Sequence, residues 1–211
     1  MKDILIQNFY GSEIEHYGCS ITGIPGVPLE NIVLNNIQLT FRGSDKPLLF
    51  EGYEDRILKE TNLTNVPELE NSYPRAEMFG KLPAYGFYIR HVNNIEFNGV
   101  RLEPKEDDKR SALVADDVNG LIINKFYAKA SLNSRSLIYL RDAEHVGISQ
   151  SSATSPIPVF LIVSGNKSKN IVLKDIDFSN VARKYLLENK AQKKQIILIR
   201  STFINELKFI D

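Results

Sequence analysis

The chain has 211 residues, of which 43% are hydrophobic and 25% charged, and its 26 Lys and Arg balance its 26 Asp and Glu. This is the composition of a globular protein, and the length supports a single domain. A formal net charge of zero excludes the basic footprint of a general nucleic-acid-binding protein. No apolar run approaches the roughly 18 residues of a membrane span, and the first residues lack the apolar core of a signal peptide. We therefore expect neither nucleic acid nor a membrane as a partner.

A short phrase, Asn-Ile followed by alternating apolar residues, recurs along the chain. Its clearest copies occupy residues 31–39, 94–102 and 170–178, and weaker copies begin near residues 3, 121 and 146. From Ile95 onward the copies are 25 or 26 residues apart. A fixed period of this length is the sequence signature of a repeat architecture.

A second apolar phrase interleaves with the first, at residues 85–89, 112–114, 137–140, 159–163 and 196–199. Each repeat thus holds two or three short strands separated by Asn, Gly, Asp or Ser. Helical spacing is a possibility only at 181–190. The pattern predicts an all-β chain folded as a right-handed parallel β-helix with about 25 residues per turn, with Asn in left-handed bends. The alternative is an antiparallel sandwich, but near-constant offsets favour the β-helix.

The repeat is interrupted once, by residues 42–84, which are rich in Gly, Pro, Glu and Tyr. Within one domain spanning 1–211, this stretch is predicted to be a loop inserted between turns. Loops of this length commonly carry binding residues. The final stretch, 195–211, alternates like a last pair of strands.

Several stretches resemble a known family: residues 18–26 and 28–32, the run 73–92 and the run 112–118. They are similar to the later turns of bacterial proteins of glycoside hydrolase family 28, the polygalacturonase-like enzymes. The resemblance covers about residues 3–130 and implies a parallel β-helix that acts on or binds pectin-type acidic polysaccharide. It implies no cofactor.

The catalytic phrases of that family are not found in this chain. Asn-Thr-Asp is absent, none of the three histidines lies in Gly-His-Gly, and Arg56 to Lys59 has one residue too many for Arg-Ile-Lys. The resemblance therefore implies that this chain corresponds to the C-terminal half of a longer hydrolase, with the catalytic turns upstream of Met1. Such a parent protein would be secreted or periplasmic.

An offset of 25 residues brings two columns of polar residues together. His91, Asp116 and Arg141 share one register, and Asp117 and Asp142 share the next. Inverting glycosidases use two carboxyl groups roughly 6.5 to 9.5 Å apart, one as acid and one as base. The candidate catalytic residues are therefore His91, Asp116, Asp117 and Asp142. The alternative interpretation is a hydrogen-bonded ladder that closes a bend.

The insertion and the strand after it supply a second set of candidates. Tyrosine rings stack on sugars and arginine forks pair with uronate carboxylates. The candidate substrate-binding residues are Tyr53, Tyr73, Arg75, Glu77, Tyr85, Tyr88 and Arg90. Alternatively, the tyrosines pack against the wall of the coil.

The sequence gives no sign of a metal or redox centre. The lone Cys19 has no partner for a disulfide or a thiolate site and is expected to be a small buried hydrophobe. Neither paired histidines nor an acidic loop of calcium-binding spacing occurs.

Two functional hypotheses follow. The first is a polygalacturonase-like glycoside hydrolase, or part of one, with a polysaccharide as its partner. The second is a non-catalytic module that binds carbohydrate or assembles with itself. An uncovered first turn would expose strand edges and apolar side chains, which a second copy or a missing N-terminal half could cover.

Overall fold

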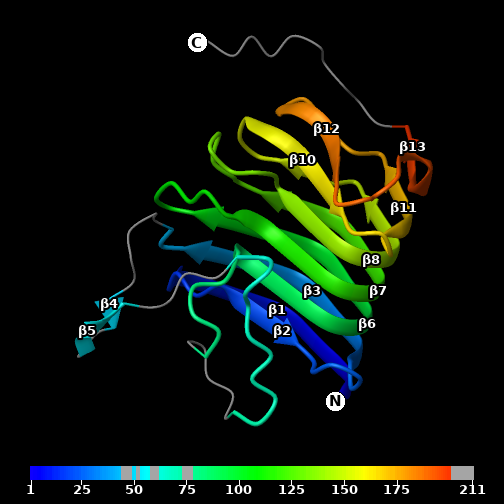
Figure 1. Cartoon of the computed structure of the whole chain (residues 1–211). Coiled ribbons are helices and arrows are strands. Elements are labelled where there is room, and N and C mark those ends of the chain that lie inside the picture. The colour runs from blue at the N-terminus through cyan, green and yellow to red at the C-terminus, as the bar shows by residue number, and fades with distance from the viewer. Residues whose placement is uncertain (44–48, 51–52, 58–61, 73–77, 201–211) are drawn as a thin grey trace.

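The computed structural model describes residues 1–43, 49–50, 53–57, 62–72 and 78–200, and for 49–50 and 53–57 it describes the backbone alone (Figure 1). The regular elements in this part of the chain are strands and one short 3-10 helix. They are β1 (Lys2–Ile14), β2 (Cys19–Thr22), β3 (Leu29–Phe41), β4 (Leu49–Phe50), β5 (Tyr53–Ile57), β6 (Ala84–Pro104), β7 (Ser111–Ala128), β8 (Ile138–Ser149), β9 (Ser152–Ala153), β10 (Ile157–Ser164), β11 (Lys169–Lys174), β12 (Val181–Glu188), η1 (Lys193–Gln195) and β13 (Ile196–Ile199).

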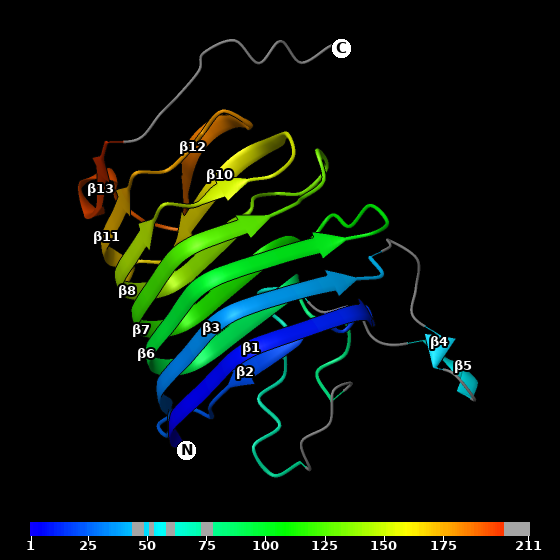
Figure 2. The same cartoon turned by 180° about the vertical axis from the view of Figure 1, so that it is seen from behind.

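The strands stack in parallel into a right-handed parallel β-helix of about seven turns, which confirms the predicted fold class. The main path runs β1, β3, β6, β7, β8, β10, β12, from the end that holds the N-terminus upward (Figures 1 and 2). Among the described strands only β4 and β5 pair antiparallel, as a small hairpin. The sandwich is thereby excluded, and residues 181–188, within the possible helix, form strand β12.

Each turn bends where a residue adopts a positive φ angle. One series of bends runs through Asn31 (φ 55°), Asn94 (59°) and Asn170 (55°), the first residues of the recurring phrase. Asparagine tolerates this left-handed conformation better than most residues. The amides also form a ladder between turns, since Asn31 Nδ2 donates to Asp3 Oδ1 at 2.8 Å and Asn94 Nδ2 to Asn31 Oδ1 at 3.2 Å. The phrase is thus a bend followed by a strand.

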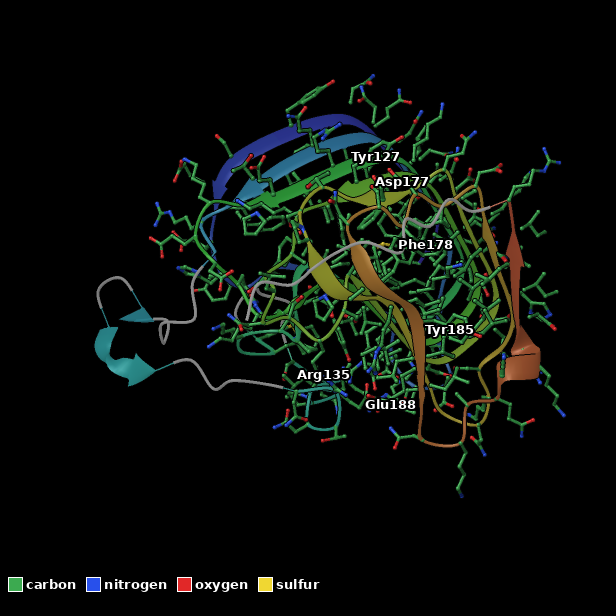
Figure 3. The ribbon with its side chains drawn as sticks, turned by 90° about the horizontal axis from the view of Figure 1, so that it is seen from above. Tyr127, Arg135, Asp177, Phe178, Tyr185 and Glu188 are labelled. Atoms are coloured by element: carbon green, nitrogen blue, oxygen red, sulfur yellow. The ribbon has the colours of Figure 1, made fainter. Side chains whose placement is uncertain are left out.

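Alternation within the strands divides each turn into an interior and an outer face. In β6, Phe87 and Ile89 lie in the continuous core, and the ring of Phe87 meets Phe97 edge-on at 5.2 Å. Seen along the coil, the turns surround this shared interior (Figure 3). The outward-facing neighbours of Phe87 and Ile89 are Tyr88 and Arg90.

The insertion covers part of the outer face. A second apolar cluster forms outside the coil, where side chains of the insertion pack on outward-facing strand residues: Val66, Phe79, Leu82, Ala84, Tyr88, Val114, Tyr139, Val159 and Ile162. Burying these rings and aliphatic groups removes apolar area from water and holds the described part of the insertion against the coil. The cover ends partway up the stack, and the candidate site lies at that boundary.

Two smaller expectations concern the ends of the chain. Cys19 is partly buried against the core, and this burial raises the pKa of its thiol to about 11. Strand β13 pairs with β11 as a further turn, in line with the alternation seen after residue 195. Residues 201–211 lie outside the described part of the chain.

Candidate functional site

A column of mostly polar or charged side chains runs along the stack on the outer face of the coil. From Arg90 onward, each member is the last residue of the strand segment that comes before a bend. We call it the strand column, and its members pair in register from turn to turn: Thr22, Arg90, Asp116, Arg141, Ser164 and Glu188. Neighbouring members are one strand spacing apart, about 4.8 Å. In the middle of the column, Arg90, Asp116 and Arg141 are neighbours of opposite charge.

Arg141 and Asp116 form the central pair of the strand column. Arg141 Nε donates to Asp116 Oδ1 at 2.6 Å, and its Nη2 donates to the other carboxylate oxygen. Asp116 is only 4% exposed and also accepts from the Tyr88 hydroxyl at 3.4 Å. The bonds to Asp116 raise the pKa of Arg141, and burial beside this carboxylate raises the pKa of Tyr88. The pair is a fixed, mutually neutralising unit.

Arg90, below Asp116 in the same column, is tied to the insertion instead. Its two terminal nitrogens donate to the carbonyl oxygens of Val66 at 2.9 Å and Pro67 at 2.7 Å, and Nη1 lies 3.3 Å from Glu68 Oε1. Arg90 is 3% exposed. It therefore anchors the insertion on the coil.

From Arg90 onward, the next residue in each turn belongs to a second column, the bend column, which consists of His91, Asp117, Asp142, Gly165 and Asn189. All five adopt positive φ angles, between 48° and 89°. The expected pairing of His91 with Asp116 is wrong by one residue, because Arg90 pairs with Asp116. The turn that contains His91 has 26 residues rather than 25. Leu102 pairs with Ala128 at an offset of 26, but Leu113 pairs with Ile138 at an offset of 25, so the extra residue lies between Leu102 and Leu113, in the loop after β6.

Within the bend column, His91 lies between two carboxylates. Its Nδ1 is 2.7 Å from Asp117 Oδ2 and its Nε2 is 3.1 Å from Glu68 Oε2. Asp142 Oδ1 accepts the backbone N–H of Lys167 at 3.1 Å. The side chains of His91, Asp117, Asp142 and Glu144 line a small groove of about 280 Å³ beside the bends. We call it the bend groove.

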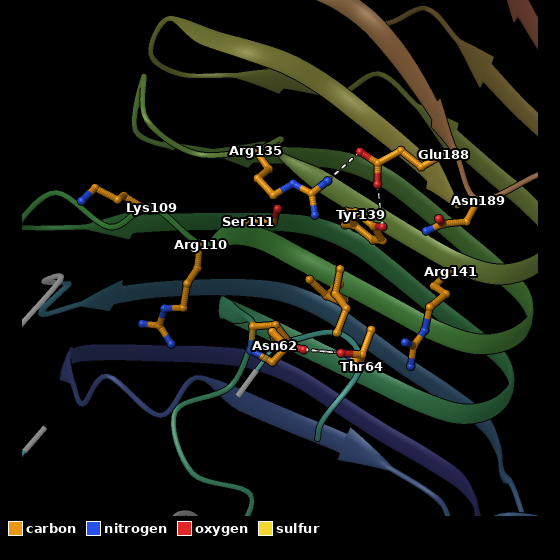
Figure 4. A pocket seen from close by; sticks show the side chains of 13 residues that line it. Asn62, Thr64, Lys109, Arg110, Ser111, Arg135, Tyr139, Arg141, Glu188 and Asn189 are labelled. Carbon is orange, nitrogen blue, oxygen red and sulfur yellow. Dashed lines mark hydrogen bonds and ion pairs between the residues drawn. The ribbon is translucent and has the colours of Figure 1, made fainter. Parts of the chain in front are cut away.

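A larger cleft of about 650 Å³ opens over the outer face, above the edge of the insertion (Figure 4). The insertion supplies one wall, the loops before β7 and β8 supply a second, and the end of β12 closes the third. The lining residues are Asn62, Leu63, Thr64, Pro83, Lys109, Arg110, Ser111, Val114, Arg135, Tyr139, Arg141, Glu188 and Asn189.

Arg135, Tyr139 and Glu188 form the most connected group in the cleft. Arg135 Nη2 donates to Glu188 Oε1 at 2.6 Å, and the Tyr139 hydroxyl donates to Glu188 Oε2 at 3.0 Å. The guanidinium of Arg135 also lies over the Tyr139 ring, 5.5 Å from its centre. Burial raises the pKa of Tyr139, so its hydroxyl keeps its proton and donates. The side chain of Arg135 is 59% exposed and faces the cleft (Figure 4).

Positive charge predominates on the cleft surface because its counter-charges are buried behind it. Arg110 is bound by Asp108 through Nε at 2.9 Å and Nη2 at 2.7 Å, and Asp108 is 1% exposed. Asp116 plays the same part behind Arg141. Of the carboxylates described, only Glu188 belongs to the cleft lining itself. The surface therefore suits an anionic ligand.

The predicted site residues are dispersed. Three of the candidate catalytic residues line the bend groove, whereas Asp116 is buried in the strand column. Tyr85, Tyr88 and Arg90 are buried and line neither the cleft nor the bend groove, and the Tyr85 hydroxyl donates to the carbonyl oxygen of Lys129. The remaining substrate-binding candidates lie outside the described residues or have undescribed side chains: Tyr53, Tyr73, Arg75 and Glu77.

The sequence reasoning missed the cleft residues Arg135 and Glu188. A signal for Glu188 did exist, because it follows Ser164 by about one repeat, but the helical reading of 181–190 hid that register. Arg135 lies in a loop outside both recurring phrases, so no periodicity marks it.

Among the described residues, no group of three or more His, Cys, Asp or Glu side chains is arranged to hold a metal ion. None of the helices in that part of the chain is long and apolar enough to span a membrane. Comparison with models of protein families, with curated proteins and with solved structures finds no match to this chain.

Proposed function

We propose that this β-helix binds acidic polysaccharide of the pectin type in the cleft over its outer face, and that the cleft binds without hydrolysing. The observation that carries the proposal is that Arg135 lies over the Tyr139 ring and Arg141 lines the same cleft, while Asp116, the carboxylate that pairs with Arg141, is buried. The resemblance of residues 3–130 to glycoside hydrolase family 28 suggests the same class of ligand.

The donors in the cleft suit uronate carboxylates. Arg135 gives one N–H group to Glu188, and Arg141 gives Nε and Nη2 to Asp116, which leaves further N–H groups of each guanidinium for a ligand. A planar guanidinium binds a carboxylate through two parallel hydrogen bonds. The side-chain amides of Asn62 and Asn189 line the same space and suit sugar hydroxyls.

Binding is favoured over hydrolysis because a general acid and a general base must both reach the scissile bond. Asp116 is bound by Arg141 and shielded from solvent, and Glu188 holds Arg135 and Tyr139. No second carboxylate stands opposite Glu188 in the described lining. The cleft thus has partners for a glycan and lacks a carboxyl pair for glycosidase chemistry.

Titration calorimetry with oligogalacturonates, and with neutral oligosaccharides of equal length, tests the proposal. We expect binding of the acidic oligomers alone, and we expect Arg135→Gln to weaken it about tenfold, the loss of one charge-assisted contact. Arg101→Gln is the matched control, since Arg101 also lies over a tyrosine, Tyr127, at 5.3 Å, on the opposite side of the coil (Figure 3). Equal binding of neutral oligomers, or equal loss in both variants, would contradict the cleft as the site.

A second candidate function is hydrolysis in the bend groove, which the gathering of His91, Asp117, Asp142 and Glu144 favours. Its test is the release of reducing ends from the same oligogalacturonates. Turnover by the wild-type chain that is abolished by Asp142→Asn and by Asp117→Asn would establish hydrolysis there. Binding without turnover leaves the cleft proposal standing alone.

A further inference from the structure

Strand β1 presents an open edge at the N-terminal end of the stack. It pairs with β3 on one side, and no described strand lies on its other side (Figure 2). A strand edge with unpaired backbone N–H and C=O groups is a template for pairing with another strand. The edge is 13 residues long.

The side chains of β1 are exposed where the same positions in the next turn are buried. Ile6 and Phe9 point into the coil and are 40% and 53% exposed, whereas their partners in β3, Leu34 and Ile37, are each 2% exposed. On the outer face, Leu5 is 60% and Tyr10 63% exposed. An apolar patch of this kind on a strand edge marks an interaction surface.

The ladder of amides also stops at this edge. Asn36 Nδ2 donates to Asn8 Oδ1 at 2.8 Å, and in the adjacent column Asn124 Nδ2 donates to Asn98 Oδ1, so each donor belongs to the later turn. Asn8 belongs to the first turn, so its own amide N–H group has no acceptor in an earlier turn among the described residues.

We propose that this edge is the interface of a symmetric dimer, in which β1 of two copies pair antiparallel, end to end. The sequence of β1 is complementary to its own reverse. When each residue faces the residue of the other copy that brings the sum of their two numbers to 15, interior positions meet interior positions and outer positions meet outer positions. The opposed residues are Lys2 with Glu13, Asp3 with Ser12, Ile4 with Gly11, Leu5 with Tyr10, Ile6 with Phe9, and Gln7 with Asn8.

Three features of that register favour a second copy as the occupant. The two apolar pairs, Leu5 with Tyr10 and Ile6 with Phe9, cover the four large exposed hydrophobic side chains of β1. Lys2 faces Glu13, whose side chain is 50% exposed although it also pairs with Arg42 and Lys105, and no like charges oppose each other. The bend at Asn8 lies at the centre of β1. Interior positions have even numbers before it and odd numbers after it, so interior residues of one copy face interior residues of the other along the whole strand.

Sedimentation velocity and light scattering of the full chain over a range of concentrations test the proposal. We expect a dimer that Leu5→Lys with Tyr10→Lys converts to a monomer, because each interface then places lysines opposite each other. Both residues are exposed within one copy, so folding should be retained, as judged by the unfolding temperature. Ile122→Lys is the matched control, since Ile122 lies in the same outer column as Leu5, is 51% exposed and is remote from the edge. It should leave the dimer intact.

The register has its own test. In a Cys19→Ala background, a mixture of Leu5→Cys and Tyr10→Cys chains should form a disulfide-linked dimer under mild oxidation, and neither variant alone should do so efficiently. A monomer at all concentrations would overturn the proposal. So would open-ended growth with concentration, which indicates head-to-tail stacking, or a dimer unaffected by the paired lysines. None of these outcomes bears on glycan binding in the cleft.

Discussion

From Arg90 onward, the strand column and the bend column lie one residue apart in each turn, yet their members share different properties. In the strand column, Arg90, Asp116 and Arg141 alternate in charge, and the first two are almost fully buried. In the bend column, the members share a positive φ angle, and their side chains bond mainly to turns and exposed neighbours. The central residues of the strand column are related by charge pairing, and the residues of the bend column are related by their backbone conformation.

The difference explains why adjacent aspartates are not equivalent. Asp116 neutralises Arg141 behind the cleft and is shielded from solvent, whereas the side chain of Asp117 is 54% exposed and pairs with His91. A buried charge that loses its partner is strongly destabilising, but an exposed pair contributes little. The same chemical group can therefore be essential at one position and dispensable at the next.

Replacing the two aspartates in turn gives the largest expected effect. Asp116→Asn should lower the free energy of unfolding by about 3 kcal/mol, because the guanidinium of Arg141 loses its carboxylate in a partly buried site. Asp117→Asn should cost about 1 kcal/mol or less. Urea denaturation of both variants measures the difference. Similar losses at both positions would mean that the columns do not differ in the way their burial indicates.

The bend column can be tested at its glycine. Gly165 has a φ of 89°, and a Cβ there would collide with the carboxylate of Asp142. We expect Gly165→Ala to lower the free energy of unfolding by about 1 to 2 kcal/mol from the backbone alone. Gly147→Ala is the matched control, since no atom lies within 4 Å of its added methyl group. In thermal or urea unfolding, a loss of stability in Gly147→Ala equal to that in Gly165→Ala would disprove the conformational argument.

The contrast between charge pairing and backbone conformation also determines how well the sequence predicts each column. The recurring Asn phrases predicted the coil and its bends, because a conformational demand recurs at every turn and repeats the residue type. Asp117 and Asp142 fell correctly into one register. The neighbour of His91 was misplaced because the column was aligned with an offset of 25, whereas one extra residue in the loop after β6 makes the offset of this turn 26, the same spacing that separates Ile95 from Leu121 in the recurring phrase.

The cleft itself could not be predicted from periodicity. Arg135 comes from a loop between turns and Glu188 from the end of β12, and they meet only because the stack brings those ends together. Tyr88 was expected to face a ligand, but the insertion packs on it. Which surface an insertion covers depends on its path in three dimensions, and the alternation of β6 gives only the direction of the side chain.

Glu68 connects the two columns, because its carboxylate contacts Arg90 at 3.3 Å and His91 at 3.1 Å. Its side chain is 40% exposed, so solvent screens both contacts, and Glu68→Gln should cost only about 0.5 kcal/mol. Its clearer effect should be faster proteolysis of the insertion, which Glu68 helps to hold on the coil. Glu144→Gln removes a surface carboxylate paired with Lys169 and serves as the control. Unchanged proteolysis in Glu68→Gln would mean that the backbone bonds of Arg90 hold the insertion alone.

The smallest effect we expect concerns a partly buried histidine outside both columns. His16 Nδ1 is buried without a hydrogen-bond partner among the described residues, and burial lowers the pKa of His16 below 6.5, with Arg110 and Lys81 adding to the shift. The unfolded chain therefore binds a proton more readily than the folded one. The stability that the neutral imidazole contributes is complete above about pH 6.5 and is lost as the pH falls from there through the lower pKa of the folded state. His16→Gln should flatten the fall in urea midpoint between about pH 7.5 and about pH 5, whereas His145→Gln, at an exposed bend, should not. Equal flattening in both variants would show that the slope does not come from the burial of His16.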